Sequence, residues 1–238
     1  MEFEKYIESS YETLAKYVNA YDNKMVMKRE NIAERGIWTA KKRYILNVWD
    51  SEGVRYEEPK LKMMGIEAVK SSTPAPCRTM IKDGLKIMMN GTEEEVIDYI
   101  DECRTKFKSL PPEEIAFPRT VSNVKKYHSH TDIYSKGTPI HARGALLFNY
   151  YIKKNKLDRK YSLIGNGEKI RFIYLKKPNI IQENVVSFIQ DFPTELNLDK
   201  YIDYDLQFEK SFLEPLKAIL DAIGWNVEKT VNLELFFT

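Results

Sequence analysis

The sequence predicts an α+β fold, in which β-strands come first and helices dominate afterwards. Two stretches rich in aromatic and β-branched residues, Trp38 to Asp50 and Val54 to Met64, flank the turn-forming Ser51-Glu52-Gly53 and are typical of a β-hairpin. Beyond Thr73 the apolar residues recur mainly at helical spacing. The clearest strand pattern in this second part is Lys169 to Leu175.

The chain opens with a predicted amphipathic helix, because apolar residues recur three and four positions apart. They are Phe3, Tyr6, Ile7, Tyr11, Leu14 and Val18. Met25 to Met27 is a short apolar alternation that predicts a brief strand. The hairpin follows, and near Gly65 it gives way to helices. We therefore expect a boundary between two parts of the chain at that glycine.

The second part begins with Thr73-Pro74, which predicts a helix start with a hydroxyl N-cap and proline at the first helical position. This helix is expected to stop near Asn90-Gly91, where Thr92 can cap the next helix. Pro111-Pro112 breaks the chain. The later helices are predicted at Ala142 to Lys154 and at Asp199 to Ile223, the second with a core stripe of Leu206, Phe212, Leu213, Leu216 and Leu220.

Charge is distributed unevenly along the 238 residues, although the net charge is only +2. Residues 119–177 contain 14 basic and 3 acidic residues, whereas residues 182–238 contain 4 basic and 11 acidic residues. A basic block beside an acidic end suggests a surface for a polyanion. A solvated charged face explains the same numbers equally well, so charge alone leaves both interpretations open.

Other classes of protein are disfavoured by composition. No apolar run approaches the ~20 residues of a membrane span, and the charged first segment is unlike a signal peptide. Cys77 and Cys103 lack metal-ligand spacing and are expected to be reduced thiols. The three histidines, two of them His128 and His130, have too few companion ligands for zinc. We expect no bound metal and a cytoplasmic protein.

The K-K-R-Y run at Lys41 to Tyr44 is the first candidate site. In a strand, Lys42 and Tyr44 would share one face, with Lys41 and Arg43 on the other. An ammonium and a phenol on one face can test the minor-groove acceptors of a duplex, which lie in nearly the same place whatever the sequence. Four residues alone still favour the alternative, a strand with Tyr44 in the core and solvated lysines.

A longer match favours minor-groove contact by the K-K-R-Y run. W-T-A-K-K-R-Y-I-L-N-V-W-D, E-G-V-R-Y-E-E-P-K-L-K-M-M-G and K-S-S-T-P, ending at Pro74, resemble family B DNA polymerases of the T-even bacteriophage type. The resemblance implies the end of a polymerase palm over residues 1–65, a thumb over 66–230 and a clamp-binding-like tail over 231–238. It implies DNA contacts by Lys41, Lys42, Arg43 and Tyr44, and contacts near the primer backbone by Lys70, Ser71 and Ser72, the serines more weakly.

Two further segments are similar to the same family's thumb. They are R-T-V-S-N-V-K-K-Y, ending at Tyr127, and H-A-R-G, ending at Gly144. The resemblance implies phosphate contacts, which supply sequence-independent affinity, by Thr120, Ser122, Asn123, Lys126, Tyr127, Lys136, His141 and Arg143. A buried structural role for His141 is an equal alternative. Lys210 matches a DNA-proximal family lysine, but Glu214 stands where the family can carry a second one.

The family's catalytic motifs are missing. Neither D-x-x-S-L-Y-P nor Y-x-D-T-D occurs, so Mg²⁺ is expected on another portion of the polymerase and not on this chain. Tyr201-Ile-Asp-Tyr-Asp205 imitates the second motif, but it opens a helical run that separates its two aspartates. The resemblance also implies that the apolar tail, with Leu233, Leu235, Phe236 and Phe237, binds the sliding clamp; packing back onto the domain is the alternative.

The resemblance therefore implies a carboxy-terminal fragment or split subunit of a phage replicative DNA-directed DNA polymerase. Its expected partners are primer–template DNA, an amino-terminal catalytic portion and the sliding clamp, in the cytoplasm of a bacterial host. The chain alone is not expected to be catalytic. The alternative is a non-catalytic DNA-binding or clamp-interacting module derived from a truncated polymerase. Met1 is compatible with a split gene and with a cloned fragment.

Overall fold

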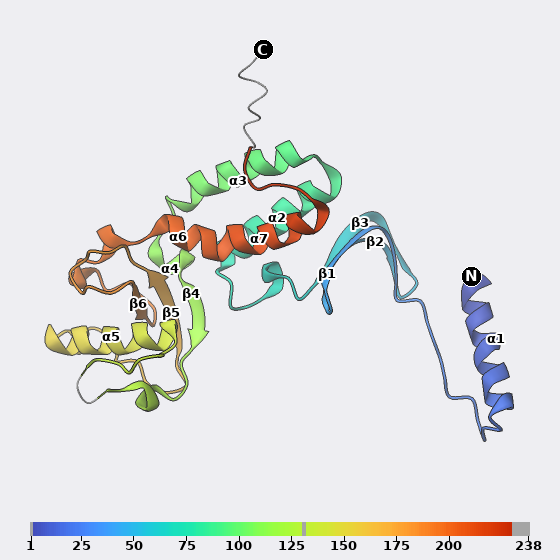
Figure 1. Ribbon diagram of the computed structural model, residues 1–238, viewed down its shortest axis with the longest axis horizontal. Coiled ribbons are helices and arrows are strands. Elements are labelled where there is room, and N and C mark those ends of the chain that lie inside the picture. The colour runs from blue at the N-terminus through green and yellow to red at the C-terminus, as the bar shows by residue number, and fades with distance from the viewer. Residues whose placement is uncertain (1, 130–131, 230–238) are drawn as a thin grey trace, which may run out of the picture. The chain divides into compact units, whose positions relative to one another are not determined.

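The protein is α+β, as the sequence predicts. The computed structural model describes residues 2–129 and 132–229 and contains two three-stranded antiparallel sheets with helices (Figure 1). The chain divides into two compact units, residues 1–64 and 65–238.

The first unit contains a helix and a sheet. Helix α1 is Glu2–Tyr17, and the sheet runs in the order β1 (Asn31–Ala40), β2 (Arg43–Ser51) and β3 (Val54–Met64). The helix and the β2–β3 hairpin confirm the sequence predictions. The brief strand expected at Met25 to Met27 is wrong, because these residues have no regular structure.

The second unit begins with helical hairpin α2 (Ala75–Asn90) and α3 (Glu93–Phe107). Thr92 caps α3 as predicted, in a capping box in which its hydroxyl accepts from Glu95 and the Glu95 carboxylate accepts in return. The predicted cap at Thr73 is wrong. Helix α2 starts two residues later, its N-cap position is the extended Pro74, and no side chain caps it.

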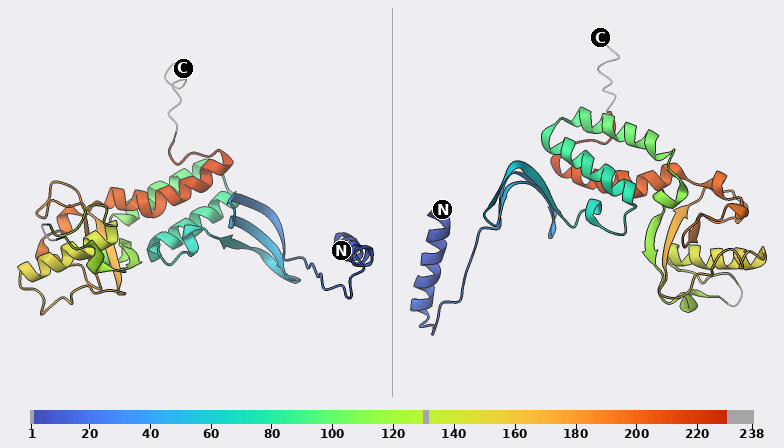
Figure 2. Two further views of the ribbon diagram at one scale, coloured as in Figure 1. Left: turned by 60° about the horizontal axis from the view of Figure 1, so that its bottom comes forward. Right: turned by 180° about the vertical axis from the view of Figure 1, so that it is seen from behind.

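A short helix α4 (Pro112–Ile115) leads into the second sheet, whose order is β4 (Phe117–Thr120), β5 (Lys169–Tyr174) and β6 (Val185–Phe188). Only β5 was predicted. Helix α5 (Ile140–Lys154), also predicted, lies against this sheet and contacts β5 and β6 (Figures 1 and 2). Their shared core contains Phe117, Leu147, Phe172 and Val185.

The remaining helical segments complete the second unit. Tyr204–Phe208 (α6), the π-helical Glu209–Leu213 (η5) and Glu214–Leu220 (α7) form one continuous run that packs on α2 and α3. The predicted start at Asp199 is wrong, because residues 199–201 form a separate 3₁₀ turn and Asp203 caps α6. The 3₁₀ turns are Glu67–Val69 (η1), Val124–Tyr127 (η2), Thr194–Leu196 (η3), Asp199–Tyr201 (η4) and Asp221–Ile223 (η6).

The π turn has a local cause. Pro215 lies two residues beyond η5, in the first turn of α7. Proline has no backbone N–H, and its ring clashes with the carbonyl group four residues earlier in a regular α-helix. Widening the preceding turn relieves that clash, and such single-turn π bulges are a known response to local strain in a helix.

Candidate nucleic-acid interface

The K-K-R-Y run forms a turn rather than a continuous strand. Lys41 and Lys42 form the exposed tip that joins β1 to β2, and only Arg43 and Tyr44 belong to β2. Lys42 adopts a left-handed backbone conformation with φ of 60°. The expectation that Lys42 and Tyr44 share one face of a strand is therefore wrong. Instead, the hairpin presents two ammonium groups at its end.

Tyr44 belongs to a row of large side chains across the first sheet. It pairs with Trp38 of β1 on one side and with Met64 of β3 on the other. Directly opposed residues in antiparallel strands point to the same face. Trp38 remains 66% exposed and Met64 is also exposed, so this face carries an accessible row of large side chains beside the lysine turn formed by Lys41 and Lys42. Arg43 is half-buried.

Ser71, Ser72 and Thr120 are brought together in the second unit. They line one hollow of about 420 Å³, together with Arg119 and Lys169. The Arg119 guanidinium donates to the carbonyl oxygens of Ser72 at 2.9 Å and Pro118 at 3.0 Å, so it holds the serine loop against β4. Lys70, just before the serines, forms an ion pair with Glu67 at 2.8 Å.

Register between β4 and β5 explains why Lys169 is in this hollow. Thr120 pairs with Lys169 and Pro118 pairs with Arg171, so these side chains share a face of the sheet. Lys169 and Arg171 are exposed. Sequence reasoning missed Arg119, Lys169 and Arg171 as site residues. For Lys169 and Arg171 the sequence did contain an indication. The alternation K-I-R-F-I-Y places both basic side chains on one face of a strand.

The loop after β4 presents polar groups to solvent. Ser122, Asn123 and Lys126 are exposed, and Tyr127 is half-buried. The loop is held by backbone bonds from Val121 N–H to the Glu168 carbonyl and from Gly167 N–H to the Val121 carbonyl, at 3.0 and 2.7 Å. The Asn166 side-chain oxygen accepts from the Asn123 N–H. Lys136 lies on a later exposed stretch.

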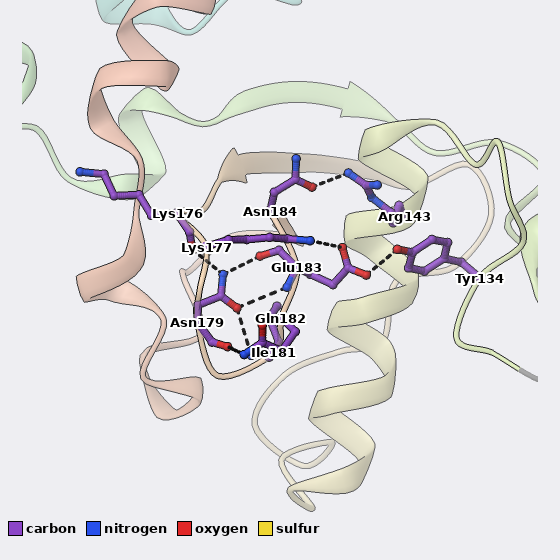
Figure 3. A network of polar contacts seen from close by, with 9 residues as sticks. All are labelled: Tyr134, Arg143, Lys176, Lys177, Asn179, Ile181, Gln182, Glu183 and Asn184. Carbon is purple, nitrogen blue, oxygen red and sulfur yellow. Dashed lines mark hydrogen bonds and ion pairs between the residues drawn. The ribbon is translucent and has the colours of Figure 1, made fainter.

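Arg143 lies in a polar network that limits its freedom (Figure 3). Its guanidinium donates to the Asn184 side-chain oxygen at 2.5 Å and lies 5.7 Å from the centre of the Tyr134 ring. The Tyr134 hydroxyl donates to Glu183, which also lies 3.9 Å from Lys177. Arg143 therefore joins α5 to the loop before β6. A contact between Arg143 and DNA would use the guanidinium N–H groups that do not bond Asn184.

A buried asparagine organises that loop. Asn179 donates to the carbonyl oxygens of Lys176 and Glu183 at 2.7 and 2.6 Å, and its own side-chain oxygen accepts from Ile181 and Glu183 at 3.1 and 3.3 Å (Figure 3). One side chain thus satisfies four backbone groups. It fixes the segment that positions Glu183 and Asn184.

His141 is half-buried in the first turn of α5. Burial lowers the pKa of its imidazole, and the positive charge of Arg119 lowers the pKa further. The ring is therefore neutral at pH 7 and carries one N–H donor and one acceptor. Its own carbonyl oxygen accepts from Ser187 at 3.0 Å, and Gly144 allows this close approach, since a Cβ there would lie 3.0 Å from the Ser187 nitrogen.

The remaining predicted residues differ in their surroundings. Lys210 pairs with Glu214 one turn later, which offsets its charge. Asp203 accepts from the Leu206 N–H at 3.1 Å, and Asp205 pairs with Lys108 at 2.9 Å, so both carboxylates have protein partners. Leu233, Leu235, Phe236 and Phe237 lie outside the described residues. Within residues 2–129 and 132–229, no three His, Cys, Asp or Glu side chains are grouped to hold a metal.

In the part of the chain that the structure describes, none of the helices has the length and apolarity to cross a membrane.

Comparison with known proteins identifies relatives of this chain. No family model matches it. It is 34% identical to the DNA-directed DNA polymerase of Escherichia phage RB69 over an alignment of 239 positions that covers 95% of this chain and 26% of the relative. It is 29% identical to the DNA-directed DNA polymerase of Enterobacteria phage T4 over an alignment of 246 positions that covers 98% of this chain and 27% of the relative. The chain thus spans about a quarter of these curated relatives. It is homologous to a segment of the DNA-directed DNA polymerases of T4-type phages, consistent with a carboxy-terminal fragment of them.

Proposed function

We propose that this chain is the duplex-gripping part of a replicative family B DNA polymerase and completes the enzyme together with a catalytic portion. One observation carries the proposal: nearly the whole chain matches only about a quarter of each phage polymerase. The exposed donors of the second unit and the lysine turn of the first supply the chemistry that gripping needs. The first unit would belong to the palm and the second would be the thumb.

Phosphate contacts would supply most of the affinity. Ser71, Ser72 and Thr120 share one hollow with Arg119 and Lys169, and hydroxyl and cationic donors are the groups that contact phosphate oxygens. Ser122, Asn123 and Lys126 extend this set along the adjoining loop. Such contacts do not depend on base sequence. A replicative enzyme needs that property, because it must hold every sequence.

The lysine turn would test the new duplex from its minor groove. Lys41 and Lys42 are exposed at the tip of the hairpin, and their long side chains could reach into a groove. The acceptors that base pairs present there are nearly equivalent. The Tyr44 hydroxyl at the start of β2 would be a second donor. It would approach the duplex from the face of the sheet, whereas Lys42 would approach from the turn.

The catalytic portion would supply phosphoryl transfer with its two Mg²⁺ ions. Neither aspartate motif of the family occurs in this sequence. The chain would therefore contribute no metal ligand to the reaction. Its role would be to position the primer terminus and to keep the enzyme on the template. In the same proposal the apolar tail, which contains Leu233 and Phe236, would tether the enzyme to a sliding clamp and raise its processivity.

Primer extension tests the proposal. The catalytic portion is produced from the source genome as the polypeptide that matches the remaining three quarters of the RB69 polymerase. This chain, that polypeptide and their mixture are each incubated with primer–template DNA and Mg²⁺. Extension only in the mixture is the expected result. Equal extension by the catalytic polypeptide alone would leave this chain as a non-catalytic DNA-binding or clamp-interacting module.

A further inference from the structure

Exposed apolar side chains are concentrated at one end of the chain. Among the described residues, nine of the fifteen exposed large apolar side chains lie between Phe3 and Met27, which we name the amino-terminal arm (residues 3–27). Phe3 is 72% exposed and Tyr17 is 87% exposed. Helix α1 has no buried residue. Single exposed apolar residues are ordinary, but a cluster of this size marks an interaction surface.

Helix α1 has two distinct faces. Phe3, Ile7 and Leu14 follow one another at spacings of four and seven residues, so they share a face, while Lys5 and Glu12 lie on the opposite one. An isolated helix of this length is marginal in water, because most helical stability in proteins comes from packing of the apolar face. The apolar face of α1 therefore requires a covering surface.

The first unit does not supply that surface. Its only buried residues, within the part described, are Ile45, Leu46, Asn47 and Val48, all on β2. Within the arm, the Tyr11 hydroxyl lies 3.9 Å from the Met27 sulfur. A unit with so small a core cannot cover a further helix from its own residues.

We propose that the amino-terminal arm is a docking surface for the catalytic portion, whose receiving surface is apolar; this inference rests on the proposed function. The T4 match covers 98% of the chain, so at most a few residues of the arm lie outside it. In that relative the matched span is only 27% of the polypeptide, so most of the relative lies outside the match. For a carboxy-terminal fragment, the residues that correspond to the arm would adjoin that remainder. Aromatic residues and methionine, which make up six of the nine exposed large apolar side chains of the arm, are enriched at protein interfaces.

Two matched double variants test the docking. Phe3→Ser with Leu14→Ser alters the apolar face, and Lys5→Ser with Glu12→Ser alters the polar face without changing the net charge. Because α1 buries nothing, neither pair should change the thermal unfolding of this chain. Binding to the catalytic polypeptide is measured by calorimetry. The first pair should weaken binding about tenfold or more, as loss of interface-centre side chains does, and the second pair should leave it unchanged.

The outcomes separate this inference from the function on which it rests. Tight binding and primer extension by both pairs alike would refute docking through the arm and leave the split polymerase intact. No binding of the catalytic polypeptide by the unaltered chain would refute the proposed function. Self-association of the unaltered chain in sedimentation, abolished by the first pair only, would assign the arm to a second copy and overturn the proposal.

Discussion

The Arg119 guanidinium bonds the carbonyl oxygen of Ser72 at 2.9 Å, and this bond joins strand β4 to the loop that precedes α2. Forty-seven residues separate the two along the chain. The hydroxyl groups of the serine loop thereby acquire a fixed position relative to Thr120. Arg119 is thus a positioning residue for the proposed phosphate contacts, in addition to being a cation.

Replacing Arg119 by Lys tests that distinction. Lysine keeps the charge but cannot reproduce the planar guanidinium that bonds the carbonyl oxygens of Ser72 and Pro118 together. The assembled enzyme should bind primer–template DNA about three- to tenfold more weakly, since one to two hydrogen bonds are lost. The slope of log affinity against log salt should not change. An unchanged affinity would mean that Arg119 acts only as a phosphate-binding charge, because lysine supplies that charge equally well.

A substitution in the lysine turn can remove the charge of Lys42 while keeping the backbone geometry of the turn. Glycine readily adopts the left-handed conformation that Lys42 has at φ of 60°, so Lys42→Gly should keep the turn and change the free energy of unfolding by no more than about 1 kcal/mol. Combined with Tyr44→Phe, it should strongly impair primer extension. Glu52→Gly is the matched control, because Glu52 has φ of 54° in the other hairpin turn. Unimpaired extension by the double variant would remove the minor-groove assignment.

Lys126→Ala should reduce the salt dependence of DNA binding. A lysine that neutralises one phosphate releases counterions, so its removal lowers the slope of log affinity against log salt by about 1. Lys86→Ala is a control with the same loss of charge, since Lys86 pairs with Asp83 on α2 and belongs to no proposed contact. Equal slopes for both variants would show that Lys126 does not touch the backbone.

His141 should make stability depend on pH. Its folded-state pKa lies below the unfolded value of about 6.5 because of burial and Arg119, so the unfolded chain takes up the proton first as pH falls. The stability present above pH 6.5 is therefore lost as pH falls through the folded pKa. Glutamine cannot titrate, so His141→Gln should lose less thermal stability between pH 7.5 and 5.5 than the unaltered chain. Identical losses would contradict the pKa direction.

Asn179→Ala should be the most destabilising of these changes. It removes the partner of four backbone groups in a buried position and should lower the free energy of unfolding by about 2–4 kcal/mol. Denaturant unfolding measures the change. Gln182→Ala is the matched control, because Gln182 is exposed and makes one bond to the same loop. A cost below about 1 kcal/mol would show that water replaces the lost bonds.

The sequence predicted elements that carry their own local signal. The cap at Thr92, the helix ending near Asn90 and strand β5 all follow from neighbouring residues. The break at Lys41-Lys42 was missed because turn glycine or asparagine is absent there, so residues 38–50 resembled one strand. Strands β4 and β6 are only four residues long, and their pairing with β5 depends on tertiary contacts.

The candidate site likewise contains residues that the sequence predicted and residues that only the fold brings together. Ser71, Ser72 and Thr120 were predicted from the family resemblance, and their shared hollow then follows from the fold. Lys169 joins them through the β4–β5 register, which no local pattern specifies. Arg119 joins them through its hydrogen bond to the Ser72 carbonyl oxygen, which depends on the fold. The involvement of Arg143 with Asn184 likewise depends on packing between α5 and a distant loop, as Gly144 permits.

The π turn ahead of Pro215 determines which changes of length this helix tolerates. A π turn is an α-helix that contains one surplus residue, so deleting one residue from Glu209–Leu213 would keep both ends of the helix in phase. Replacing Pro215 as well would remove the clash that ordinary winding would otherwise restore. Inserting one residue would rotate everything downstream by about 100°. Leu216, Ile219 and Leu220 would then leave the core. Related chains that differ in length here should therefore lack one residue rather than gain one.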